Sequence, residues 1–190
     1  MAKRKPLYRA FAIDSAAKSG VAQASSRFGW AITTEPVKPA ESRTMRASGW
    51  AIESADAVII ERPWGGYMSA RMGLSRELGR WLEALHAHGY APASVELVYP
   101  YAWQSGLWGR LPKHADPKAH SRAWAEVICG YAPNTQDECD AACMLHWWLV
   151  KHGLVTKIDG PLLEIACTVP EPVLGKRGRV AKRGREKRTK

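Results

Sequence analysis

The sequence predicts an α/β domain built on one central mixed sheet of five strands with helices on both faces. Three observations lead to this fold class. The chain has 190 residues, the size of one domain with its own core. Its β-type segments come first and then alternate with helical segments. The uninterrupted apolar run AVII, at residues 57–60, is typical of a strand buried on both faces of a sheet.

Three strands are expected in the first quarter of the chain. Residues 8–13 (YRAFAI) are aromatic and aliphatic and lead to Asp14. Residues 28–33 (FGWAIT) are expected to pair with them as a hairpin, across a loop rich in Ser, Ala and Gly. Residues 34–46 contain prolines and mixed charge, which favour an edge strand.

The middle of the chain carries the other two strands. Residues 50–55 are interpreted as part of a short helix, and the buried strand at 57–60 ends at Glu61. Residues 95–99 (VELVY) have the composition of the fifth strand. The stretch 100–112 is rich in Pro, Trp and Gly and is interpreted as a loop.

Helical periodicity and capping signals predict three helices. The first has apolar residues at helical spacing and ends at Gly89. The second follows an N-cap at Asp116, and the third begins with a T-x-x-E capping box formed by Thr135 and Glu138. Their expected ranges are 69–88, 117–129 and about 136–152.

The net charge of +10 is concentrated at the two ends of the chain. Nine of the 28 Lys and Arg residues lie in residues 175–190, and four more lie in residues 1–9. The C-terminal run has no apolar periodicity, so we expect a disordered basic tail that contacts nucleic-acid phosphates through residues such as Lys176, Arg177 and Arg179. Solubility alone is the alternative role of such a tail.

These features give a domain plan of four parts. A basic N-terminal arm covers residues 1–7, and the α/β domain described above covers residues 8–155. A C-terminal extension covers residues 156–174, and the basic tail covers residues 175–190. No apolar stretch approaches the ~20 residues of a membrane-spanning helix, and no signal peptide follows the basic N-terminus, so a cytoplasmic protein without membrane contact is expected.

The four cysteines are expected to be free thiols. They form no CxxC pair and no framework spacing. Cys139, Cys143 and His146 follow one another along two helical turns, which raises the alternative of a zinc site. Three ligands strung along one helix cannot converge tetrahedrally by themselves, so buried apolar thiols are the favoured interpretation.

Four acidic residues stand apart from ordinary surface charge. Asp14 and Glu61 each follow a strongly apolar strand, where a charge is costly unless a cation or a hydrogen-bond donor meets it. Asp137 and Asp140 lie three residues apart at the start of the last helix and therefore share a face. Their repulsion exceeds the ~0.3–1 kcal/mol that a helix dipole offsets. A hard divalent cation such as Mg²⁺ would supply the compensation.

The order of these acids resembles that of the RuvC family of Holliday-junction resolvases, in the RNase H-like superfamily. The matching segments are FAIDSAAKSG with Asp14, AVIIERPW with Glu61, and DECDAACML with Asp137 and Asp140. The resemblance covers about residues 8–152. It implies an RNase H-like fold in which all four acids are catalytic and hold two Mg²⁺ ions, for which Mn²⁺ can substitute. Glu138 is then a capping residue.

The chain departs from the family pattern in two places. The family commonly has Pro-Gly after its first Asp, whereas this chain has Ser15 and Ala16. The interval between Asp14 and Glu61 is also short, which indicates a trimmed region around the third strand. Such compact members are typical of phages, so the resemblance implies the cytoplasm of a bacterium or of a phage-infected host.

The resemblance also implies DNA contacts. Trp64 lies three residues after Glu61, where the family carries an aromatic residue that inserts at the crossover; packing on the neighbouring helix is its alternative role. Lys113, Lys118 and Arg122 lie where the family places cations that contact the scissile strand. A solvated helix face is the alternative explanation for these three.

The function expected from these residues is a Mg²⁺-dependent endodeoxyribonuclease that resolves four-way junctions by paired nicks. Paired cuts imply a homodimer, with the helix at residues 69–88 as interface through Met72, Leu78 and Trp81. One alternative is an RNase H-like nuclease acting on flaps, forks or RNA–DNA hybrids. A second, from another class, is a non-catalytic nucleic-acid binder, which gains nothing from four acids near phosphates.

Overall fold

The fold is described by a computed structural model. It describes residues 8–16, 18–38, 43, 47, 49–50, 52–64, 66–90, 95–111 and 115–158. The predicted N-terminal arm, the basic tail and Lys113 lie outside these residues, as do Lys176, Arg177 and Arg179. No helix among the described residues is long and apolar enough to cross a membrane.

The predicted mixed sheet of five strands is confirmed, with the order β3-β2-β1-β4-β5. The central strand β1 (Arg9–Asp14) pairs antiparallel with β2 (Gly20–Ser25) and parallel with β4 (Ala57–Glu61). The outer strands are β3 (Thr33–Pro36), antiparallel to β2, and β5 (Val95–Val98), parallel to β4. Strands β1, β4 and β5 therefore end at the same edge of the sheet.

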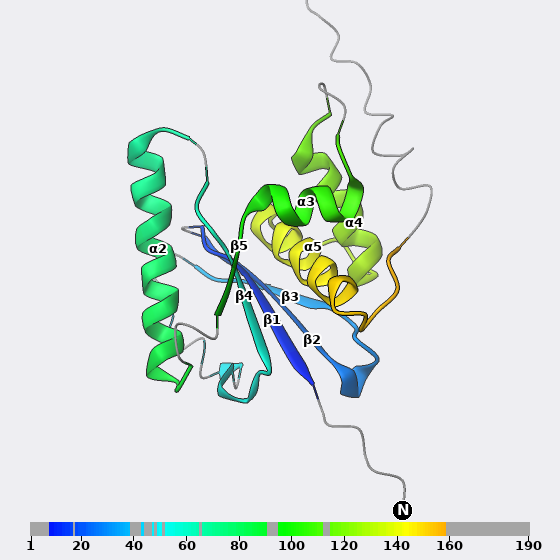
Figure 1. The fold of residues 1–190 in the computed structure, drawn as a ribbon, viewed down its shortest axis with the longest axis horizontal. Helices are drawn as coiled ribbons and strands as arrows, with labels where there is room; N and C mark the ends of the chain where they lie inside the picture. Colours follow the sequence, from blue (N-terminus) through cyan, green and yellow to red (C-terminus); the bar gives the residue numbers. More distant parts are fainter. Residues whose placement is uncertain are drawn as a thin grey trace, which may run out of the picture.

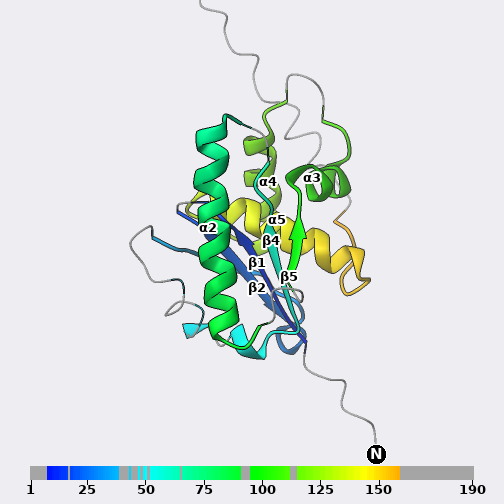
Figure 2. The ribbon, with the colours of Figure 1, turned by 60° about the vertical axis from the view of Figure 1, so that its left-hand side comes forward.

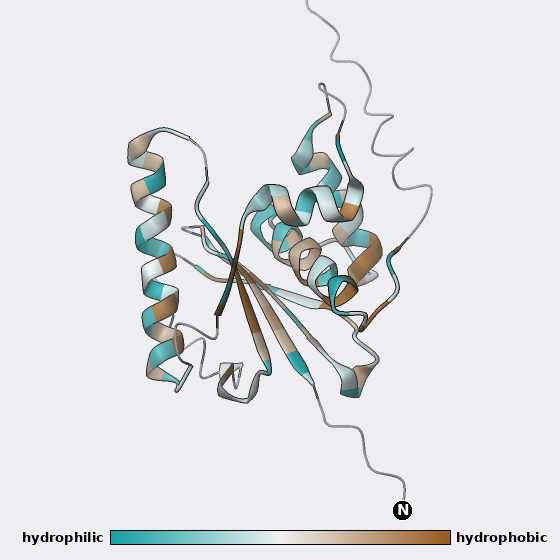
Figure 3. Cartoon of the chain, in the orientation of Figure 1, coloured by the Kyte–Doolittle hydropathy of each residue, from teal (hydrophilic) through white to brown (hydrophobic). Residues whose placement is uncertain are grey.

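Helices cover both faces of this sheet, as predicted. Helix α2 (Met68–Ala87) lies on one side (Figures 1 and 2). On the other side lie α3 (Pro100–Trp108), α4 (Pro117–Cys129) and α5 (Gln136–Lys151) (Figure 1). Each face buries its own apolar cluster, and the hydrophobic strands between the layers are visible in Figure 3.

The face of the sheet toward α5 is lined with very small side chains. Alternation along β1 and β2 directs Ala10, Ala12, Ala22 and Ala24 to this face. Helix α5 in turn presents buried Ala and Cys residues. Small side chains on both sides allow the helix to lie close to the sheet.

The closest approach occurs at Gly20. A Cβ atom added there would overlap the backbone of Asp137 and Glu138, at the start of α5. Gly20 also pairs with Asp14 in the sheet register. The missing side chain of Gly20 therefore lets the first turn of α5 rest beside the end of β1.

The predicted hairpin partner at residues 28–33 was wrong. The strand that pairs with β1 is Gly20–Ser25, whereas Ser26–Phe28 form a 3-10 helix (η1). Gly29 and Trp30 then adopt positive φ angles, which interrupt any extended run. The edge strand predicted at residues 34–46 is the shorter strand β3, Thr33–Pro36. It begins one residue before the predicted range and ends at the proline. The expected short helix at 50–55 is a 3-10 turn, Ile52–Ser54 (η2).

The predicted loop at 100–112 was also wrong in its first part, which is helix α3. Pro100 occupies the first turn, where a missing N–H costs nothing. Gly106 lies inside the helix because the ring of Trp147 occupies the space of a side chain there. Pro and Gly, which normally indicate a loop, are here helix start and packing residues.

The other helices agree with prediction. Helix α2 spans Met68–Ala87, one residue from the expected limits, and α4 follows its Asp116 cap and ends before Gly130. The capping box of Thr135 and Glu138 is complete in both directions. The three cysteines among the described residues are free thiols, as expected.

Trp81 does not belong to an exposed interface. It is fully buried, its ring stacks on that of Trp50, and its indole N–H donates to the Ser19 hydroxyl. Leu78 also packs against the core, whereas Met72 is 66% exposed. Of the three side chains proposed for a dimer interface on α2, Met72 is therefore the one that is largely exposed, Leu78 is partly buried and Trp81 is excluded.

The close approach at Gly20 generates a prediction of stability. Gly20→Ala is expected to lower the free energy of unfolding by about 1–3 kcal/mol, because an overpacked side chain displaces α5. The matched control is Gly79→Ala on α2, where an added Cβ meets open space; it should raise stability by about 0.5–1 kcal/mol. Urea denaturation measures both, and a Gly20→Ala protein as stable as the parent would contradict the packing account.

Candidate active site

Four carboxylates converge at the edge where the parallel strands end. Asp14 is the last residue of β1, and Glu61 is the last residue of β4. Alternation places both on the same face as Ala12 and Ile59, which is the face covered by α5. Asp137 and Asp140 come from the first two turns of α5. Residues distant in the sequence are thus brought together by strand ends and one helix start.

Electrostatics show how close these groups are. Burial, followed by the charges of Glu61, Asp140 and Asp137, raises the pKa of Asp14 well above its usual range. Burial also raises the pKa of Glu61, to about 7, with contributions from Asp140 and Asp137. A nearby like charge disfavours the charged form of a carboxyl group, so these contributions place the acids near one another.

The helix acids respond in the same direction. The pKa of Asp140 is raised by burial, partly offset by hydrogen bonds from Ser121 and Gln136. The pKa of Asp137 is also raised by burial, and the nearby ammonium groups of Lys118 and Lys18 oppose this shift. All four acids are therefore held in positions that disfavour their charged form.

Neighbouring side chains orient two of the four carboxylates. The indole N–H of Trp103, on α3, donates to Oε2 of Glu61 over 2.8 Å, and this Trp is fully buried. Gln136 Nε2 donates to Oδ1 of Asp140 over 3.0 Å, and Arg122 Nε donates to Oε1 of Gln136 over 3.0 Å. Arg122 therefore acts on the acid cluster through Gln136.

Asp14 is the least compensated member of the set. Its side chain is 9% exposed, and no hydrogen bond to its carboxylate is found among the residues that the structure describes. A buried acid without a donor is either protonated or compensated by a cation. Asp14 thus has the environment expected of a metal ligand.

The donor set fits a hard divalent cation. It consists of carboxylate oxygens alone, which suit Mg²⁺ or Mn²⁺ better than Zn²⁺. Within the described parts of the chain, no three His, Cys, Asp or Glu side chains already stand as a group that could hold a metal ion. Binding of an ion by all four carboxylates here therefore calls for rotation of their side chains toward a common point. The same finding leaves the alternative zinc site at Cys139, Cys143 and His146 without support.

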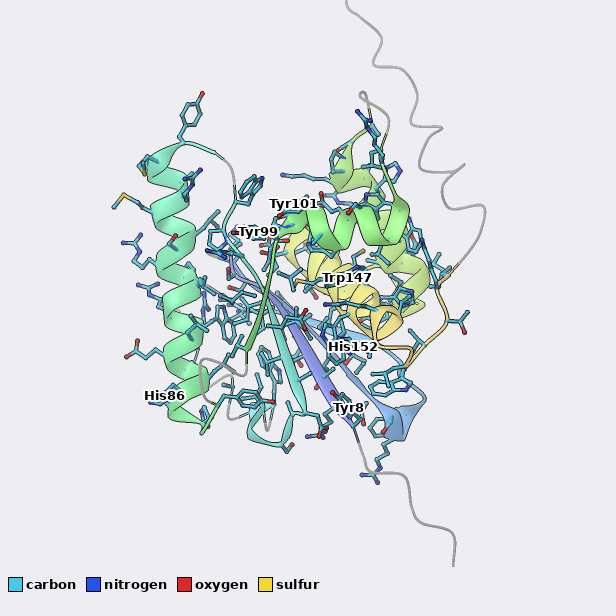
Figure 4. The ribbon with its side chains drawn as sticks, in the orientation of Figure 1. Tyr8, His86, Tyr99, Tyr101, Trp147 and His152 are labelled. Atoms are coloured by element: carbon cyan, nitrogen blue, oxygen red, sulfur yellow. The ribbon has the colours of Figure 1, made fainter. Side chains whose placement is uncertain are left out.

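An aromatic cluster adjoins the carboxylates. Trp64 is 60% exposed and contacts Tyr99 and Tyr101 edge-on, with ring centroids 5.4 and 5.7 Å apart. Trp64 is therefore not a core residue, and its ring contacts are with these two tyrosines. The two tyrosines lie at the end of β5 and the start of α3 (Figure 4).

Two of the predicted cations, Lys118 and Arg122, lie among the described residues. Lys118 lies at the start of α4 close enough to Asp137 to lower its pKa, and Arg122 reaches the cluster through Gln136. Lys113 lies outside the described residues. Lys18, near Asp137, was not predicted, and its position in the loop after Asp14 was the available signal.

Three contributing residues were also missed from sequence. Trp103 and Tyr101 were hidden because their segment was taken for a loop. Gln136 follows the Thr135 cap, where a polar residue usually faces water, so its bond to Asp140 had no sequence signal.

The acid cluster generates a prediction of pH dependence. The pKa of Glu61 has its ordinary value of 4.5 in the unfolded chain and is about 7 in the folded protein. As the pH rises through this window, the unfolded chain loses the proton first, so the folded state is progressively destabilised. The Tm of the chelator-treated protein should therefore fall between about pH 5 and pH 8.

Glu61→Gln should flatten this decline, because glutamine does not ionise yet still accepts the Trp103 hydrogen bond. Glu126→Gln, which removes an exposed carboxylate from α4, is the control and should keep the original slope. A Glu61→Gln protein with an unchanged pH profile would argue against a strained carboxylate at this position.

Comparison with known proteins places the fold. No protein-family model and no curated protein matches the sequence. Among solved structures, the chain is similar to Thermus thermophilus RuvC in complex with a Holliday junction substrate, with 17% identity and a TM-score of 0.52. It is also similar to a structure of Thermus thermophilus RuvC at 19% identity, again with a TM-score of 0.52. Both matches cover 77% of this chain and 97% of the other. The protein therefore has a RuvC-like fold of the RNase H type.

Proposed function

We propose that this protein is a metal-dependent, structure-selective DNA endonuclease that resolves four-way junctions. The observation that carries the proposal is the convergence of Asp14, Glu61, Asp137 and Asp140 at one edge of a RuvC-like sheet. A related protein with this fold, at 17% identity, is known in complex with a Holliday junction substrate. A set of buried acids is unfavourable in a protein that only binds phosphates, and it is suited to divalent cations.

The proposed chemistry is hydrolysis of a phosphodiester. Two Mg²⁺ ions would supply a water nucleophile at neutral pH and neutralise charge on the phosphate. Asp14, Glu61, Asp137 and Asp140 would hold the ions, and Glu61 would also orient or activate the attacking water. Trp103 keeps the Glu61 carboxylate oriented for that role, and Gln136 does the same for Asp140.

Cations around the acids would position the DNA strand. Lys118 and Lys18 act on Asp137 and can reach a phosphate bound next to it. Arg122 is exposed at the same helix end. We further propose that additional phosphate contacts come from Lys113 and from the basic tail, including Lys176, Arg177 and Arg179. Such contacts do not distinguish one DNA sequence or shape from another.

Two symmetric cuts require two active sites, so the proposal includes a homodimer. Met72 on α2, with the exposed Met68 and Tyr67 at the start of the same helix, provides an apolar surface for the partner.

The first test of this proposal is cleavage by ligand variants. Asp14→Asn and Asp137→Asn should each abolish cutting of a labelled immobile four-way junction in Mg²⁺, while junction binding persists, because a lost ligand disables the ions but reduces phosphate repulsion. Asp116→Asn is the control: asparagine still caps α4, so cutting should continue.

Duplex, flap and RNA–DNA hybrid substrates belong in the same assay. If flaps or hybrids were cut in preference to four-way junctions, they and not the junction would be the substrate of this site. Full activity of Asp14→Asn would refute the site itself.

The second test concerns Trp64. If its ring stacks at an opened crossover, Trp64→Ala should slow cutting of intact junctions by an amount corresponding to about 1–3 kcal/mol and affect nicked junctions much less. Trp64→Phe should retain much of the activity. Because Trp64 is 60% exposed, the alanine variant should keep its Tm. Equal losses on intact and nicked junctions would oppose the wedge role.

A further inference from the structure

We propose that Tyr101, stacked on Tyr99 and backed by Arg62, is a binding platform for an unpaired nucleobase next to the carboxylate site. The inference rests on the proposed function, because the neighbouring site identifies the ligand as DNA. It adds to Trp64 a second aromatic group with a distinct geometry, a face-to-face stack at the beginning of α3.

The three side chains form a continuous stack. The rings of Tyr99 and Tyr101 are 5.3 Å apart with an interplanar angle of 17°. The guanidinium carbon of Arg62 lies 4.8 Å from the centre of the Tyr99 ring, within the range of a cation–π interaction. Tyr99 is thus covered by an aromatic ring and by a cation, while Tyr101 is 54% exposed and retains free ring surface.

The stack is held in place from several sides. Trp64 contacts both tyrosine rings edge-on, at 83° and 68°. Tyr99 immediately precedes α3, and Pro100 restricts the backbone between the two rings. A platform whose rings are already fixed loses little conformational entropy when a base stacks on it.

The position of the stack relative to the acids favours a nucleic-acid strand as the occupant. Arg62 follows Glu61 directly, and Glu61 pairs with Val98, the residue before Tyr99. The backbone N–H of Arg62 donates to the Val98 carbonyl, so the two segments are joined at this point. Tyr99 and Tyr101 can be followed in Figure 4 at the upper end of β5. A strand whose phosphate lies at the carboxylates therefore passes within reach of the tyrosines.

Exposed aromatic rings beside a cation also occur elsewhere on the protein. Phe28 is 67% exposed, and Arg27 lies 5.6 Å from its ring centre. This pair follows β2, whose last residue, Ser25, pairs with Arg9 at the beginning of β1. It therefore lies at the end of the sheet opposite the carboxylates and offers a matched control.

The test is binding of single-stranded DNA to the full-length protein in a metal chelator, so that cleavage does not occur. The probe is a thymidine oligonucleotide with one 2-aminopurine, whose fluorescence falls when the base stacks. A second oligonucleotide carries abasic sites and keeps the same phosphates. Tyr101→Ala should weaken binding of the base-containing probe by roughly 5-fold to 150-fold and remove the quenching. Binding of the abasic probe should not change.

Two variants and the control make the result specific. Tyr101→Phe keeps an aromatic face and should bind as the parent does, whereas Tyr101→Leu keeps apolar contact with Trp64 but should lose the quenching. Phe28→Ala should behave as the parent. Unchanged quenching in Tyr101→Leu, or equal weakening by Phe28→Ala, would overturn the platform.

Junction cleavage in Mg²⁺ is measured on the same preparations. A protein that shows the Tyr101-dependent stacking but cuts no DNA would refute the nuclease and retain the platform. A protein that cuts junctions without Tyr101-dependent stacking would retain the nuclease and refute the platform.

Discussion

The contact between the first turn of α5 and β2 at Gly20 is the constraint on which the site depends. Asp137 lies on that turn and Asp140 on the next one, and Asp14 is paired with Gly20 in the sheet. Any side chain at position 20 would separate the helix acids from the strand acid. The alanines that line the same face extend this close approach along β1 and β2. Small residues on this face thus allow the acidic side chains to lie close together.

That arrangement opposes stability and suits the proposed metal chemistry. Burial raises the pKa of Asp14, Glu61, Asp137 and Asp140, and repulsion within the set adds to the shift of all but Asp137, so folding alone disfavours their ionised state. The surrounding hydrogen bonds and cations compensate only in part. Trp103 and Gln136 fix two of the carboxylates, whereas Asp14 has no donor among the described residues. Such incomplete compensation is unusual in a structural core and is typical of a site completed by a cation.

Sequence reasoning succeeded where the signal was local. The run before Glu61, the Asp116 cap and the Thr135–Glu138 capping box are decided by neighbours in the chain, and each element formed as predicted. It failed where packing between distant segments decides which secondary structure a segment adopts. Residues 20–25 have low β-propensity because α5 needs small residues there, and FGWAIT has high β-propensity yet is interrupted by two positive φ angles. Helix α3 was not predicted because Gly106, which normally indicates a loop, makes room here for the Trp147 ring. The four acids were proposed from their places after apolar strands, their spacing and their order along the chain, whereas Trp103 and Tyr101 became visible only once α3 was in place.

The central claim, that four carboxylates form one divalent-cation site, can be measured without any DNA. Mn²⁺ added to the chelator-freed protein can be followed by electron paramagnetic resonance, in which bound ions lose the signal of the free ion. We expect saturable binding that is accompanied by proton release, because carboxyl groups with raised pKa values still carry protons that the metal displaces. Asp14→Asn should abolish most of this binding and Asp116→Asn should preserve it. Absence of binding to the parent protein, or binding unchanged in Asp14→Asn, would contradict the account.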